Sequence, residues 1–530
     1  MSASATTFSN GGPRARARTR AEAVFFELWP LAALTILAAA LRLSTLDLQS
    51  FWYDEAFTPV HVLHPSLWAT LRSVLHTENT PPLWYVIAWA DSRAFGTGEI
   101  ALRWPSALAG VATVPLAWAI GRELTGRRVT AIATAALVAL NPLLVWYSQE
   151  ARAYALFVLV VALAMWCFLR ALRTPTPRRM AAFALSGSLA LLSHYFAVFL
   201  LIPMVIWLAS DRARRRAALP AIGALALVGL ALLPLISAQG GHGTQWIGRW
   251  ALASRLQAIP QYYLTGYSGA PLGHGVELLV ALPILAGLGY GLWRVLDPPE
   301  ERGALIALAI AAGGVLPPLA LVAFGADYLA PRNLLAAAIP VTALIAVVVA
   351  SRRAGPVGIA LVATTALAFF AISLDVDLSP RLQRGNWRGV AKELSVAAGG
   401  GSASGKARSV AGASPAAGGA ARAIATVELG AAPLEYYLPS LRNLAPGRTV
   451  TVGEIDETGY APLRASAGEP PAPGFRLYDR REVDGLIVYR FVAPLPRAVS
   501  ETELRRHVIT LAHPEVLVSA GSGPVGAPGA

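Results

Sequence analysis

The feature that most constrains this chain is a series of long apolar segments separated by clusters of arginine. The first apolar run extends from about Leu28 to Leu43, and the last covers residues 357–374. A helix of about 20 apolar residues crosses a lipid bilayer while satisfying its own backbone hydrogen bonds. Hydrophobic residues make up 55% of the 530 residues and charged residues 14%, and the mean hydropathy is +0.52. We therefore predict an all-α polytopic membrane protein.

The net charge of +13 comes almost entirely from arginine, because Lys392 and Lys406 are the only lysines. A basic chain can bind nucleic acid, but these arginines lie between apolar runs, where they set membrane topology. The single cysteine, Cys167, lies within an apolar run. The sequence thus offers neither a disulfide framework nor a thiolate metal site, and we expect no nucleic-acid partner.

Membrane orientation follows from the arginine clusters. Four arginines at residues 14–20 precede the first apolar run, so the positive-inside rule puts the N-terminus in the cytoplasm and residues 44–103 outside as a first outer loop. Alternation of later clusters predicts about eleven transmembrane helices, with a break near His194 between two short spans and a final exit after residue 374. The apolar run 83–95 is too short to cross, so we predict an interfacial helix there.

The chain divides into four predicted parts. Residues 1–25 form a basic, disordered N-terminus, and residues 26–375 form the transmembrane domain. Residues 376–518 form a small extracytoplasmic α/β domain that contains a Gly/Ala/Ser-rich linker at 397–421. Residues 519–530 form a disordered tail. This organisation predicts a multi-pass protein of the bacterial plasma membrane.

Two adjacent carboxylates, Asp54 and Glu55, follow the first span and lie among aromatic residues. Charged groups at the membrane interface are costly unless they are solvated or used, so this pair marks a candidate active site. Adjacent acids after a span are also often simply solvated. Further candidates fall on the same predicted face, and several are arginines that oppose the positive-inside bias and suit bidentate binding of a lipid phosphate. These further candidates are Glu78, Arg103, Glu150, Arg152, Tyr154, His194 and Arg332.

Four motifs follow one another in the first part of the chain: WYDEA at 52–56, ENTPPLWY at 78–85, GEIALRWPSA at 98–107 and SQEARAY at 148–154. Together they resemble bacterial members of the dolichyl-phosphate-mannose protein mannosyltransferase superfamily. The resemblance is strong over residues 29–195 and weaker at 328–332 and 386–388. It implies the GT-C fold and an enzyme that transfers a hexosyl or pentosyl group from a polyprenyl-phosphate donor to a cell-envelope glycan, lipid or protein on the extracytoplasmic face.

The resemblance also implies roles for the candidate residues. Asp54 would be the general base with Glu55 beside it, because an oxygen nucleophile must lose a proton. The phosphate leaving group needs positive charge rather than an acid, which suits Arg103, Arg152 and Arg332. One direct displacement would invert the anomeric carbon. The remaining candidates, Glu78, Glu150, Tyr154 and His194, would shape the acceptor site or the second outer loop. Many relatives have a histidine before the Pro-Pro pair, where this chain has Glu78-Asn79-Thr80, so that histidine's role does not carry over.

Several alternatives stay open at this stage. His194 fits an aromatic belt at least as well as a site. The histidines at 61, 64 and 76 do not make a convincing metal site, although a loosely held divalent cation at Asp54 and Glu55 is possible. A transporter or flippase for envelope lipids would use charges near the bilayer centre and internal repeats, neither of which is evident. A non-catalytic scaffold that binds polyprenyl lipid is a further alternative.

Overall fold

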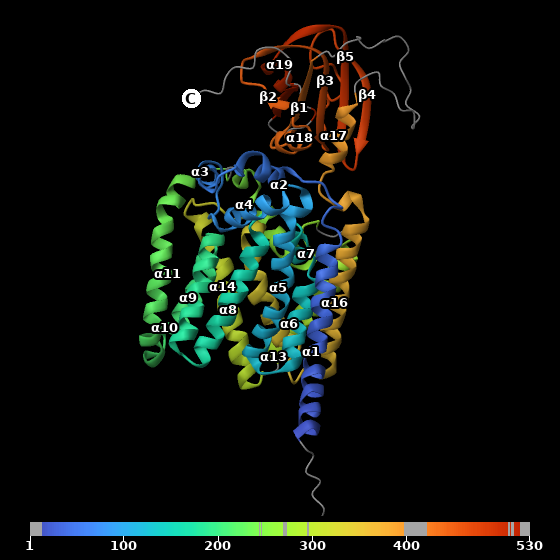
Figure 1. Ribbon diagram of the computed structural model, residues 1–530. Coiled ribbons are helices and arrows are strands. Elements are labelled where there is room, and N and C mark those ends of the chain that lie inside the picture. The colour runs from blue at the N-terminus through green and yellow to red at the C-terminus, as the bar shows by residue number, and fades with distance from the viewer. Residues whose placement is uncertain are drawn as a thin grey trace, which may run out of the picture.

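The computed structural model describes residues 13–242, 244, 246–268, 273–293, 296–396, 421–506, 509 and 514–519. A bundle of long helices carries a β-sheet domain beyond one of its ends (Figure 1). The predicted fold class, a helical membrane part with a C-terminal α/β domain, is confirmed. Residues 1–12 of the predicted N-terminus, almost all of the predicted linker and nearly all of the predicted tail lie outside the described residues.

A helix is present at each segment that was predicted to span the membrane. Six helices of the described residues are long and apolar enough to cross, or seven if the bent pair α6–α7 counts as one span. The figure of about eleven spans therefore stays a prediction. The bundle helices are α1 (Pro13–Leu43), α5 (Glu99–Thr125), α6 (Arg128–Leu140), α7 (Pro142–Ser148), α8 (Tyr154–Arg173), α9 (Pro177–Ser193), α10 (Ala197–Ala209), α11 (Arg212–Gln239), α12 (Leu252–Thr265), α13 (His274–Trp293), α14 (Pro298–Ala323), α15 (Ala338–Val349) and α16 (Gly355–Leu378).

Helix α1 begins at Pro13, inside the segment that was predicted to be disordered up to residue 25. Proline is well tolerated in the first turn of a helix, where its missing N–H would have no partner. The alanine and arginine residues that follow are strong helix formers. Helix α1 therefore continues from its apolar part through the basic residues back to Pro13.

Short helices cover the end of the bundle that faces the sheet domain, and we call it the loop end (Figure 1). They are α2 (Tyr53–Phe57), the π-helical turn η1 (Thr58–Val62), α3 (Leu67–Thr77) and α4 (Leu83–Phe95). The bounds of α4 coincide with the helix predicted to be interfacial from its length. It ends at Gly96, whose φ of +84° is available to glycine without strain.

A break between α6 and α7, bent by 55°, turns the chain towards the loop end. Arg42 of α1 is fully buried and donates to the carbonyls of Val138 (3.3 Å) and Ala139 (2.7 Å). The last turn of α6 leaves these carbonyls without helical partners. Gly110 of α5 makes room for this contact, because a Cβ there would lie 2.1 Å from Ser148 Oγ. Arg42 thus stabilises the break rather than setting topology.

The sheet domain contains six strands in the order β2-β6-β1-β3-β5-β4, in which β1 and β3 are parallel and the other neighbours antiparallel. Asp484 and Gly485, both with positive φ, form the tight turn between β4 and β5. Its elements are α17 (Trp387–Ser395), β1 (Arg422–Val427), α18 (Ala431–Tyr437), β2 (Leu441–Asn443), β3 (Thr449–Tyr460), β4 (Arg476–Val483), β5 (Leu486–Ser500), α19 (Glu501–Arg506) and β6 (Pro514–Ser519).

The sheet domain docks on the loop end through α17 and α18. The Tyr437 hydroxyl donates to the Glu99 carboxylate and accepts from the backbone N–H of Phe51 at 2.8 Å. Arg388 forms an ion pair with the same Glu99. Trp387 is buried in a cluster that also contains Trp52. These contacts tie the sheet domain to the segment that leads into α2.

Candidate functional site

Helix α2 sends its two acidic residues in different directions. Successive side chains on a helix point about 100° apart, so Asp54 and Glu55 cannot share an environment. The Glu55 side chain is completely buried, whereas that of Asp54 is 16% exposed. One carboxylate is therefore enclosed by the protein, and the other stays partly exposed at the loop end.

Glu55 is fully engaged by Arg103 of α5. The Arg103 Nε and Nη2 groups donate to the two Glu55 oxygens at 2.7 and 2.6 Å, and the N–H of Ala151 donates to Oε1 at 2.9 Å. The other N–H groups of Arg103 donate to carbonyl oxygens of the first loop, at residues 46, 49 and 50. All five donors of this guanidinium are therefore used within the protein, and it has none left for a phosphate.

Asp54 pairs with Arg332, which follows Pro331 at the start of the 3₁₀ turn η3 (Pro331–Ala337). The Arg332 Nη1 group donates to Asp54 Oδ2 at 2.5 Å, and the arginine side chain is 22% exposed. The guanidinium also lies 4.7 Å from the ring centre of Trp246. A second ion pair, between Arg255 and Asp327 at 2.6 Å, fixes the turn that precedes Arg332. The Asp54–Arg332 pair thus lies at an accessible point of a rigid frame.

Glu78 and Arg152 form a third pair. The Arg152 Nη2 group donates to Glu78 Oε2 at 3.0 Å, and the Tyr85 hydroxyl donates to the same oxygen at 2.5 Å. Glu78 is buried, and the Arg152 side chain is 13% exposed. Glu78 thus fixes the position of the partly exposed Arg152 side chain.

Glu150 forms a fourth pair, with Arg384 of the segment that joins α16 to α17. The Arg384 Nη2 group donates to Glu150 Oε2 at 3.1 Å, and the Arg384 side chain lies 4.2 Å from the ring centre of Trp146. Burial raises the pKa of Glu150 to about 7, against the opposing effect of Arg384. The sequence analysis did not single out Arg384, although the weak resemblance at 386–388 begins two residues after it.

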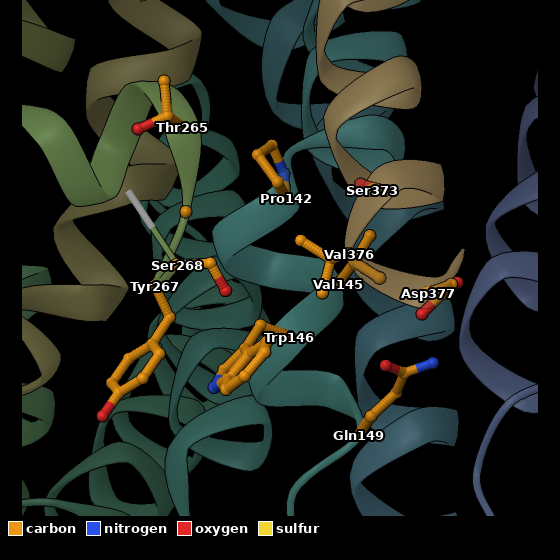
Figure 2. Close-up of a pocket in the computed structure, with 11 residues that line it drawn as sticks. Pro142, Val145, Trp146, Gln149, Thr265, Tyr267, Ser268, Ser373, Val376 and Asp377 are labelled. Carbon is orange, nitrogen blue, oxygen red and sulfur yellow. The ribbon is translucent and has the colours of Figure 1, made fainter. Parts of the chain in front are cut away.

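Aromatic side chains lie around these ion pairs. Tyr147 and Tyr154 make an edge contact at 4.9 Å between ring centres, and Trp146 stacks on Tyr267 at 4.8 Å. Burial and the charge of Asp54 raise the pKa of Tyr53, so its phenol stays protonated. A small pocket, with a cavity volume of about 10 Å³, borders Trp146 and Tyr267 (Figure 2). The surroundings of Asp54 are therefore largely aromatic, with a few polar groups.

His194 lies between α9 and α10, where the sequence predicted a break. Its ring stacks on Phe157 at 4.6 Å, and its Nδ1 accepts the N–H of Phe196 at 3.2 Å. Burial and the charge of Arg332 lower the pKa of His194 to about 3, so the ring is neutral. His194 supports the aromatic wall and is buried at 4% exposure.

No group of three or more His, Cys, Asp or Glu side chains within the described part of the chain could hold a metal ion. The possible divalent cation at Asp54 and Glu55 would need the Glu55 carboxylate, which Arg103 occupies. These residues therefore do not fit such a cation.

Comparison with known proteins bears on this arrangement. Residues 79–237 match the family described as dolichyl-phosphate-mannose-protein mannosyltransferase. The structure of ArnT from Cupriavidus metallidurans bound to undecaprenyl phosphate superposes with a TM-score of 0.51 at 12% identity, covering 87% of this chain and 98% of ArnT. The apo structure gives a TM-score of 0.50 at 13% identity, covering 87% and 97%. The chain has the GT-C fold.

The resemblance inferred from the four motifs is confirmed at the level of the GT-C fold, whereas the bacterial origin stays a prediction. AglB, the oligosaccharyltransferase of Archaeoglobus fulgidus, in complex with an inhibitory peptide and a dolichol-phosphate, has a TM-score of 0.45 at 13% identity. That alignment covers 69% of this chain, which spans 57% of the AglB chain. No curated protein sequence matches the chain significantly. Asp54 and Arg332 both lie outside the matched segment 79–237, so any role for them depends on the geometry of the site.

Proposed function

We propose that this GT-C protein is an integral membrane glycosyltransferase that transfers a sugar from a polyprenyl-phosphate donor to a cell-envelope glycan, lipid or protein on the extracytoplasmic face. The match to the mannosyltransferase family and the fold shared with ArnT, which was solved with undecaprenyl phosphate, support this proposal. The Asp54–Arg332 pair is the observation that carries it. Among the pairs formed by Asp54, Glu55, Glu78 and Glu150 with Arg332, Arg103, Arg152 and Arg384, the Asp54–Arg332 pair is the most exposed.

In the proposed reaction, Asp54 acts as the general base. Its carboxylate takes the proton from an acceptor hydroxyl while that oxygen forms a bond to the anomeric carbon of the sugar. The bond between the anomeric carbon and the phosphate oxygen breaks, and its electron pair leaves with the polyprenyl phosphate. One displacement of this kind inverts the anomeric carbon. Arg332 supplies the positive charge that stabilises the departing phosphate, and Arg152 adds a second cation nearby.

The pairing of Asp54 with Arg332 favours a defined order of binding. A carboxylate held by a guanidinium is a weaker base than a free one. A lipid phosphate competes for the same guanidinium, because arginine binds both groups through the same N–H donors. Arrival of the donor would therefore transfer Arg332 from Asp54 to the phosphate and release the base for the acceptor. Glu55 and Arg103 act as positioning residues in this scheme.

Radiolabelled transfer from polyprenyl-phosphate sugars to an envelope extract tests the proposal. Membranes carrying Asp54→Asn should bind the donor lipid but lose transfer by roughly 10²- to 10⁴-fold, as expected for loss of a general base. Asp47→Asn is a matched control, because Asp47 is exposed in the same loop. Full transfer by Asp54→Asn would disprove the base assignment.

The same preparation separates the alternatives. Donor binding by the wild type without transfer from any donor would favour a non-catalytic scaffold that binds polyprenyl lipid. Movement of labelled lipid between the leaflets of proteoliposomes, again without transfer, would favour an envelope-lipid transporter or flippase. The charged pairs described here gather at the loop end, whereas transporters bind substrate near the bilayer centre.

A further inference from the structure

The segment between α16 and the sheet domain inserts one charged side chain into the membrane part of the protein. Arg384 follows the 3₁₀ turn η4 (Pro380–Leu382), and its side chain is 1% exposed. Its backbone N–H donates to Gln49 Oε1 at 2.9 Å. Its guanidinium lies 3.1 Å from Glu150 Oε2 and 4.0 Å from Glu55 Oε2. This arginine therefore bonds to Glu150 and lies at the limit of ion-pair distance from Glu55 of α2.

The two acids need this charge. Glu55 and Glu150 are both 0% exposed, and like charges in a low-dielectric interior repel each other. Arg103 compensates Glu55, and Arg384 compensates Glu150, so the four groups are neutral together. Removing Arg384 leaves Glu150 without its counter-ion, so Glu150 is either buried as an unpaired charge or neutralised by a proton. Without Arg384, the network beneath Asp54 is one positive charge short.

The network is directly connected to the proposed reacting groups. Glu55 follows the proposed base Asp54 in α2, and Glu55 Oε1 accepts the N–H of Ala151. Glu150 precedes Ala151 and Arg152 in the chain. A shift of either acid therefore moves the base, or the arginine near the donor phosphate, and displacements of about 1 Å can cost roughly 100-fold in rate.

We propose that Arg384 is a positioning residue of this active site: the segment that joins α16 to α17, which we call the stem, supplies the guanidinium that holds Glu150 in place beside Glu55 and so aligns Arg152 with Asp54. This inference depends on the proposed glycosyltransferase function for its kinetic consequences. Its structural consequence, a buried ion network completed by the stem, does not depend on that function.

The titration of Glu150 gives a readout that a merely structural role would not change. The groups that face Glu150 are Arg384, Arg332, Glu55, Asp54 and the phenols of residues 147, 154 and 267. Arg384 is the largest influence that lowers the pKa of Glu150. Its loss would keep Glu150 protonated to higher pH, and a neutral Glu150 no longer helps the nearby Asp54 to take a proton.

Three variants of the full-length protein test the proposal: Arg384→Met, Arg384→Lys and the control Arg381→Met. Arg381 is exposed on the same stem, so its substitution removes the same charge outside the network. We expect Arg384→Met to lower kcat roughly 10- to 100-fold with little change in the KM for the donor. The acidic limb of its rate–pH profile should rise by about one pH unit. Arg384→Lys should recover part of both effects, and Arg381→Met should match the wild type.

A double variant covers the case in which Arg384→Met fails to fold. Arg384→Met with Glu150→Gln removes both charges, so thermal stability should recover relative to the single variant, while kcat stays low. Wild-type kcat and pH profile in a folded Arg384→Met protein, or wild-type kcat in the double variant, would overturn the proposal. Failure of Glu150→Gln to recover stability at a pH where Glu150 is ionised would also overturn it. If the wild type transfers sugar from no donor, the proposed function fails instead, and the stability comparison still tests the network.

Discussion

The adjacent carboxylates Asp54 and Glu55 should respond in opposite ways when each is changed to its amide. Glu55→Gln removes the counter-ion of Arg103, whose side chain is 1% exposed and which gives Glu55 two hydrogen bonds of 2.7 and 2.6 Å. Breaking one side of a buried ion pair costs about 3–5 kcal/mol of stability. Asp54→Asn affects partners that are 16% and 22% exposed, so its loss of stability should be smaller than that of Glu55→Gln.

The effects on transfer activity should have the opposite order, with the larger loss in Asp54→Asn. Asp54→Asn should retain the thermal unfolding midpoint of the wild type and lose transfer, because a base worth roughly 10²- to 10⁴-fold has been removed. Glu55→Gln should lower the midpoint by several degrees, and its folded fraction should keep part of the transfer activity, because Glu55 positions the base without accepting the proton. Thermal unfolding of the purified protein in detergent, run beside radiolabelled transfer, measures both quantities.

A matched control is available for the buried pair. Arg103→Met should destabilise the protein about as much as Glu55→Gln, whereas the double variant Glu55→Met with Arg103→Met should recover much of the loss, because no charge stays buried. A wild-type midpoint in Glu55→Gln would refute the reasoning. Equal destabilisation by Asp54→Asn and Glu55→Gln would refute it as well.

Three further outcomes are expected. The pKa of His194 is lowered to about 3 in the folded protein, so stability should fall as pH drops from about 6.5 towards 3, by at most about 1.4 kcal/mol per unit; His194→Gln should flatten that slope in thermal unfolding at stepped pH. Gly110→Ala places a Cβ 2.1 Å from Ser148 Oγ and should lower the free energy of unfolding by about 1–3 kcal/mol. In a denaturation assay, the added substitution Ser148→Gly should recover part of that loss. Wild-type stability of Gly110→Ala alone would show that the break between α6 and α7 moves to accept the methyl group. A reporter active only outside the cytoplasm should work when fused after Leu374, and cytoplasmic activity there would reverse the predicted orientation.

The sequence by itself determined the architecture. Apolar runs and arginine clusters report the environment of each segment, so they located a helix at every predicted span and the break beside His194. The length of residues 83–95 predicted α4 with the bounds that the structure shows. Strand-like pieces after residue 421 indicated the α/β domain. The four motifs of residues 52–154 also identified Asp54, Glu55, Arg103 and Arg152 as candidate site residues.

Only the tertiary structure decided which charges pair. Arg103 reaches Glu55 across 48 residues, Arg384 reaches Glu150 across 234, and Arg332 reaches Asp54 across 278. Hydropathy and charge bias describe single segments and contain no information about such distant partners. Asp54 and Glu55 look equivalent in the sequence, but in the structure Glu55 is buried and fully hydrogen-bonded whereas Asp54 stays partly exposed. The helical turn of α2 and the packing of α5 against it determine that difference.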